Sequence, residues 1–151
     1  MTYDANWPRW IIASLARHFQ DCNANFFVEG FERDTDNVPE FVELRVDGPY
    51  IQQQLKDQWR LDVELNILIC VNNSNNAYRP QEIQGQVVKK FLDCVEVLRI
   101  GNQEPDDQTL VGCLRLQQRG PEKIVITNFG QIKNEVKQNQ SSIEGHYRMY
   151  L

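Results

Sequence analysis

The chain has 151 residues, 41% of them apolar and 25% charged, which is ordinary for one soluble domain with a core of its own. Its net charge of −5 and pI of about 5.0 argue against a dedicated nucleic-acid-binding protein, which needs clustered Lys and Arg to neutralise phosphates. The 13 Asn and 15 Gln fit either a surface for polar, uncharged contacts between subunits or a compositional habit of the source genome.

The first predicted element is an amphipathic helix over residues 7–20. Its apolar side chains recur at helical spacing: Trp7, Trp10, Ile11, Leu15 and Phe19. His18 lies beside this stripe, where a lone histidine is more often a packed or surface side chain than a ligand. Residues 25–30 are predicted to form a short strand, and the polar segment 31–40 is predicted to be a loop.

Two strands with a period of two are predicted next, at residues 41–47 and 59–71. The second is too long and too apolar for an edge strand, so we expect it at the centre of a sheet. The Asp-Gly-Pro segment at residues 47–49 predicts a break after the first of these strands. Residues 50–57 are predicted to be a long loop at the tip of this antiparallel hairpin, and a tight two-residue turn is not expected. Ion pairs are expected across the hairpin among Arg45, Glu43, Asp62 and Glu64.

A second helix is predicted at residues 80–94, followed by strands at 95–101 and 109–119. Residues 123–127 could be a strand or an irregular arm, and residues 129–142 are ambiguous. The last residues alternate again, and they predict a final strand. The predicted fold is therefore α+β, in one domain over residues 1–151. Its mostly antiparallel or mixed β-sheet has a long hairpin and packs against two α-helices.

No motif for catalysis, cofactor binding or metal binding is found in the sequence. Carboxylates at 29–36 and 104–107 lie in predicted loops without the pattern of a calcium site, so they are interpreted as solvated charge. Ser14, Ser74 and Cys113 have no base in a recognisable motif, and phosphate-binding glycine loops are absent. We therefore predict that the chain is not an enzyme and uses no cofactor and no metal.

The cysteines lack the CxxC or Cys/His spacing of a metal site, and we interpret all four as buried, reduced thiols: Cys22, Cys70, Cys94 and Cys113. The N-terminus has no apolar signal core, and no run reaches the length of a membrane span. The sequence therefore predicts a protein that is made and used in the cytoplasm, or in a particle assembled there, without a membrane partner.

Five segments carry a resemblance to a known family: WPRWIIASLARHF, FVELRVDGPY, WRLDVELNILICV, EIQGQVVKKFLD and SIEGHYRMYL. In this order they resemble the tail terminator and tail-completion proteins of tailed bacteriophages. The resemblance implies a non-enzymatic virion protein, which forms a ring, usually a hexamer, at the head-proximal end of the tail tube. Such a ring stops tube assembly and provides a docking surface for the head. It implies contacts with the tail tube protein and with neck proteins, while genomic DNA passes through the lumen without specific binding.

Two groups of residues are expected at interfaces of such a ring. One lies in the predicted hairpin loop and would contact the adjacent ring or tube: Tyr50, Gln52, Gln53 and Gln54. The other lies near the end of the chain and forms either an interface patch or part of the packed sheet: Tyr147, Arg148 and Tyr150. The alternatives are another neck component, such as a head–tail stopper or adaptor, and a small enzyme or nucleic-acid-handling accessory protein.

Overall fold

The computed structural model describes residues 2–22, 24–30, 38–72, 77–99, 109–118, 123–131 and 138–151. In chain order its elements are α1 (Trp7–Phe19), β1 (Asn25–Val28), β2 (Glu40–Leu55), β3 (Gln58–Asn72), α2 (Arg79–Leu92), β4 (Val95–Leu98), β5 (Leu110–Gln117), β6 (Val125–Gln131) and β7 (Gln138–Tyr150). The predicted loop residues 31–37 and 101–108, and residues 132–137 of the ambiguous segment, lie outside the described residues.

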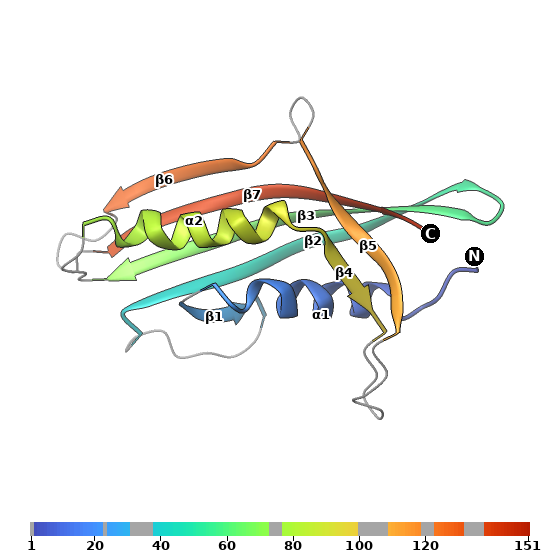
Figure 1. The fold of residues 1–151 in the computed structure, drawn as a ribbon, viewed down its shortest axis with the longest axis horizontal. Helices are drawn as coiled ribbons and strands as arrows, with labels where there is room; N and C mark the ends of the chain where they lie inside the picture. Colours follow the sequence, from blue (N-terminus) through green and yellow to red (C-terminus); the bar gives the residue numbers. More distant parts are fainter. Residues whose placement is uncertain are drawn as a thin grey trace.

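One mixed sheet holds all these strands, in the order β1-β2-β3-β7-β5-β4, with β6 paired to β7 outside this path (Figure 1). Among the strand pairs that the structure describes, only β1 and β2 run parallel. Strand β7 is long enough to have two partners along one edge: β6 pairs with its first half and β5 with its second. The predicted α+β class and the central position of β3 are confirmed.

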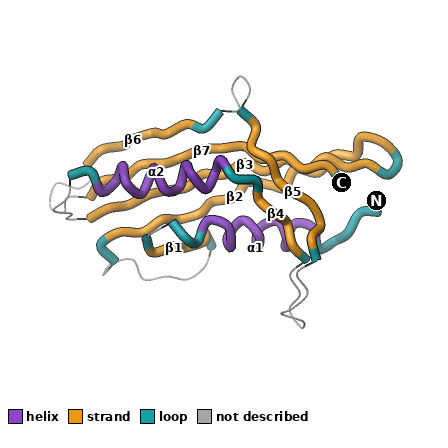
Figure 2. Tube along the Cα trace, in the orientation of Figure 1, coloured by secondary structure: helices purple, strands orange, loops and turns teal. Residues whose placement is uncertain are grey.

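Both helices lie on one face of the sheet, and their apolar stripes bury against it (Figure 2). The ring of Phe91 in α2 lies between two other aromatic rings, with centroid distances of 5.0 Å to Phe19 and 5.9 Å to Tyr147. All three rings are fully buried. Together they join α1, α2 and β7 in one core, in which substitutions that change volume are costly.

The predicted long loop at residues 50–57 is wrong. Strand β2 continues to Leu55, which pairs with Gln58, so the hairpin closes in a two-residue turn at 56–57. The Asp-Gly-Pro segment that suggested a break is accommodated as a β-bulge, with a shift of register between Asp47 and Tyr50. Gly48 takes a φ of +105° there, which a residue without a Cβ adopts at little cost. Pairing therefore resumes beyond the bulge.

A bidentate ion pair connects the start of α2 to the start of β2. Arg79 donates from Nη2 to Glu40 Oε1 at 2.6 Å and from Nε to Glu40 Oε2 at 2.8 Å. These hydrogen bonds hold the pKa of Glu40 below its ordinary value of 4.5. Because the pKa is lower in the folded state, the stabilisation is complete above the unfolded-state pKa and is lost as pH falls through the folded-state pKa.

We expect Glu40→Gln to lower the free energy of unfolding by about 1 kcal/mol at neutral pH, because a partly exposed bidentate pair contributes about that much. The difference from the unmodified protein should shrink as pH falls through the lowered pKa of Glu40, because the carboxylate is then protonated in the folded state as well. Urea unfolding of both proteins at neutral and acidic pH measures this. An equal difference at both pH values would show that the carboxylate charge contributes nothing.

Candidate functional site

The far part of the β2–β3 hairpin, here named the hairpin arm (residues 50–60), extends past the ends of both helices (Figure 1). Two large side chains on it are exposed although they are apolar or aromatic: Leu55 is 64% exposed and Tyr50 is 53% exposed. Gln52, Gln53 and Gln54 are exposed as well, and Gln53 donates a hydrogen bond to the carbonyl of Lys56 in the turn. Solvent-exposed apolar side chains on a projecting element are typical of contact surfaces.

The base of the hairpin arm is held firmly. The backbone of Trp59 exchanges two hydrogen bonds with Leu151, at 2.8 Å and 2.9 Å. Its ring lies 6.0 Å from that of Trp7 and 5.7 Å from that of Tyr3, measured between centroids. The arm is therefore a paired ribbon with a fixed base, and its position relative to α1 is set by aromatic packing.

Tyr147, Arg148 and Tyr150, which were predicted as one group near the end of the chain, do not share one environment in the structure. Tyr147 is fully buried, so its assignment to an interface patch is wrong, and the alternative of a packed residue is confirmed. Alternation along β7 puts it on the same face as Ile143 and Met149, which is the face that the helices cover. Arg148 points to the opposite face and is partly buried, whereas Tyr150 is 66% exposed and remains available for contact.

The hydroxyl of Tyr147 donates a hydrogen bond of 2.8 Å to the carbonyl oxygen of Phe91, in the last turn of α2. Burial raises the pKa of this phenol above its usual range, so it stays a donor at any ordinary pH. We expect Tyr147→Phe to destabilise the protein by about 1–2 kcal/mol, because a buried carbonyl loses its partner. Thermal unfolding measures the loss. An unchanged melting temperature would contradict this role of the hydroxyl.

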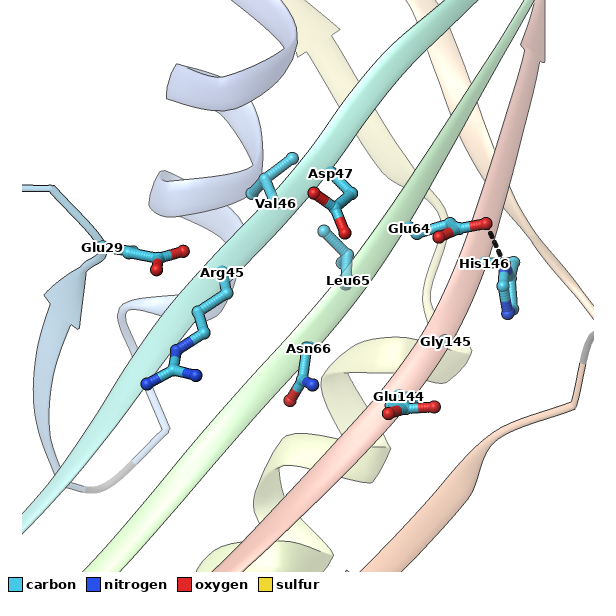
Figure 3. A pocket seen from close by; sticks show the side chains of 10 residues that line it. All are labelled: Glu29, Arg45, Val46, Asp47, Glu64, Leu65, Asn66, Glu144, Gly145 and His146. Atoms are coloured by element: carbon cyan, nitrogen blue, oxygen red, sulfur yellow. Dashed lines mark ion pairs between the residues drawn. The ribbon is translucent and has the colours of Figure 1, made fainter.

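The sheet face opposite the helices carries two rows of polar side chains in register across β2, β3 and β7. One row is Arg45, Asn66 and Glu144, and the other is Asp47, Glu64 and His146. We name these six residues the open face. With Glu29 they line a depression of about 350 Å³ (Figure 3).

Four carboxylates surround this depression, against one arginine and one histidine. His146 Nδ1 lies 3.7 Å from Glu64 Oε1, whereas Asp47 stands directly opposite Glu64 with the same charge. Like charges directly opposite each other destabilise a sheet, so the Asp47–Glu64 pair does not contribute to its stability. The negative potential of the open face disfavours phosphate groups at close range.

The predicted ion pairs across the hairpin are wrong, because the observed register of β2 and β3 does not place these residues opposite one another. Arg45 faces Asn66, and its Nε binds Glu43 Oε1 of its own strand at 3.0 Å. Asp62 accepts hydrogen bonds of 2.8 Å from Arg60 and 2.6 Å from Arg148. Strand β2 continues to a turn at 56–57, and the resulting register puts Arg45 opposite Asn66 and Glu43 opposite Leu68. Strand β7 supplies a partner for Asp62 that no local pattern reveals.

Two of the nucleophile and base candidates, Ser14 and His18, make hydrogen bonds to backbone groups. The buried Ser14 Oγ accepts a hydrogen bond of 3.0 Å from the backbone N–H of Leu98, and Ser74 lies outside the described residues. His18 Nε2 donates to the carbonyl of Lys90 at 2.7 Å, as expected of a packed side chain. Among the residues that the structure describes, no group of three His, Cys, Asp or Glu side chains has the arrangement of a metal site.

The expectation that all four cysteines are buried is wrong for two of them. Cys22 and Cys70 are buried, but Cys94 is exposed and Cys113 is half-buried. Cys94 precedes β4 and Cys113 lies in β5, and these strands form a ribbon with one face open to solvent. Apolar neighbours in the sequence indicated burial, but in a strand they point to alternate sides.

The open face could not be recognised from the sequence. Alternation correctly placed Glu64 and His146 on the outward sides of their strands, but the pairing of β3 with β7 joins residues that are far apart in the chain.

None of the helices in the described part of the chain is both long and apolar enough to cross a membrane. No protein-family model matches the chain, and a search of curated proteins finds no match.

Proposed function

We propose that the chain is a structural virion protein that forms a homo-oligomeric ring, hexameric by the resemblance, at the head-proximal end of a phage tail. The ring ends tail-tube assembly, joins the head to the tail, and leaves a central channel through which DNA passes. The protein is assembled in the host cytoplasm and stays in the particle. The hairpin arm is the observation that carries this proposal, because a projecting ribbon with a fixed base that exposes Tyr50 and Leu55 suits contact with a neighbouring ring.

A second support comes from strand β6, at an edge of the sheet. Within the described residues it pairs only with β7, and its own sequence VITNFGQ carries no charge. Ile126 and Phe129 on it are 43% and 53% exposed. Edge strands of monomers usually carry charges or proline that discourage pairing, so this edge favours contact with a further copy of the chain.

A third support is the charge of the open face. A channel for DNA must let phosphates pass without binding them, and a surface with more carboxylates than basic groups does so by repulsion. A nucleic-acid-handling protein would need a contiguous basic groove instead. The charge of the open face therefore favours a DNA channel over a nucleic-acid-handling accessory protein. The preference for a ring over a monomeric adaptor rests instead on the exposed apolar side chains of the hairpin arm and of β6.

The first experiment is the mass of the purified protein in solution, followed by negative-stain imaging with and without tail tubes. Closed rings that cap the ends of tubes are expected. A protein that stays a monomer and never forms a ring with any partner would overturn the proposal in favour of the adaptor. Rings that bind the head side but leave tube length uncontrolled would instead indicate a stopper, another neck component.

A further inference from the structure

Two of the four cysteines meet on the outer face of the β4–β5 ribbon. Cys113 in β5 lies opposite Glu96 in β4, and Cys94 precedes Glu96 by two residues, so both thiols are on the same side of the ladder. Val95 and Leu114 point to the other side and are fully buried. Cys94 and Cys113 are therefore near neighbours, and the Cys94 side chain contributes to raising the pKa of the Cys113 thiol.

The two thiols differ in their surroundings. Cys94 is exposed and lies just before the first paired residue of β4, so the strand ladder does not hold its backbone. Cys113 is half-buried, and burial, the neighbouring Cys94 thiol and Glu96 all raise its pKa, while Arg115 acts in the opposite direction. Cys94 is therefore the thiol that an external reagent reaches first, and Cys113 is placed to react with it afterwards.

We propose that Cys94 and Cys113 form a dithiol oxidation site, which a low-molecular-weight disulfide converts to an intramolecular disulfide bond. The Cys94 thiolate attacks one sulfur of the reagent, and the other half of the reagent leaves as a thiol. The Cys113 thiolate then attacks Sγ of Cys94 and displaces the second half of the reagent. Two protein thiols are oxidised, and one reagent disulfide is reduced to two thiols, so protons and electrons balance.

The bond would join the end of α2 to the middle of β5, since Cys94 follows α2 by two residues. It would close a loop of twenty residues, from 94 to 113, and so restrict the unfolded chain. We expect a rise of roughly 5–10 °C in the melting temperature, which a reducing agent reverses. This site does not depend on the ring proposal, and either can fail without the other.

The test uses the full chain, reduced and then incubated with oxidised glutathione at about pH 8, where thiols begin to ionise. Intact mass should show the loss of two hydrogen atoms and no retained glutathione, and peptide mapping should link Cys94 to Cys113. The variant Cys113→Ser should keep one glutathione on Cys94, because no second thiol displaces it. The variant Cys94→Ser should stay reduced.

Cys70→Ala serves as the matched control, because it removes a buried thiol and should leave the linkage unchanged. The proposal is overturned if the native protein retains glutathione on Cys94, if it cross-links between copies, or if it stays fully reduced while its fold is intact. A linkage that forms equally well only after unfolding in urea would also overturn it, because the native contact would then play no part.

Discussion

Replacing Gly145 by alanine is expected to destabilise the protein by about 3 kcal/mol, the upper part of the range for overpacked cores. A Cβ at this position of β7 would overlap the ring of Phe91. That ring has no room to retreat, since it is fully buried between Phe19 and Tyr147. Either α2 moves away from the sheet or the aromatic core repacks, and both lose native contacts.

Gly85→Ala is the matched control, with the same chemical change in α2. Nothing lies within 4 Å of a Cβ at Gly85, which is exposed on the helix. Alanine should therefore stabilise the protein there by up to about 1 kcal/mol through helix propensity alone. Urea unfolding of the two variants should give changes of opposite sign. A loss of less than about 0.5 kcal/mol for Gly145→Ala would mean that Phe91 is less constrained than its packing indicates.

The second large effect concerns assembly. We expect the double variant Tyr50→Ser with Leu55→Ser to abolish the joining of heads to tails and to leave the fold intact. Both side chains are more than half exposed on the hairpin arm, so their loss costs the monomer little. At an interface of the proposed ring the same two side chains would be buried, and apolar anchors of this kind dominate binding. Counts of joined particles by electron microscopy measure the effect.

The chain offers a matched control for this variant. Tyr78→Ser with Leu92→Ser removes the same two side-chain types from the two ends of α2, where they are 74% and 60% exposed. Particles carrying this control should assemble normally. If both double variants assemble equally well, the hairpin arm is not the docking element. If both fail, the loss reflects surface chemistry in general and the arm has no special part.

Local patterns were sufficient for most of the elements. The stripe from Trp7 to Phe19 predicted α1, and the structure buries it as expected. The alternation from Trp59 to Val71 predicted the central strand, because a period of two places every second side chain on one face. The predicted end of β2 at the Asp-Gly-Pro segment was wrong, since a bulge there depends on pairing with β3, which is a property of two strands.

The candidate surfaces required more than patterns. Tyr50 was expected at an interface and Tyr150 either there or in the packed sheet, and both side chains are exposed, because each lies on a projecting or terminal part of the sheet. Tyr147 was placed among them only by its closeness in sequence, although its alternation with Arg148 already put the two on opposite faces. The acidic open face went unrecognised, since its two rows combine three strands whose pairing no short segment encodes.

By itself the sequence determined the α+β class, both helices, the central strand and the alternating sides of the residues in the strands that it predicted clearly. These follow from side-chain periodicity, which acts over a few residues. Only the tertiary structure decided which strands are neighbours, where the hairpin ends, which carboxylates share a face and which thiols meet. Those depend on the pairing of distant segments, whose register is set by which face of each strand is buried and by the geometry of the turns.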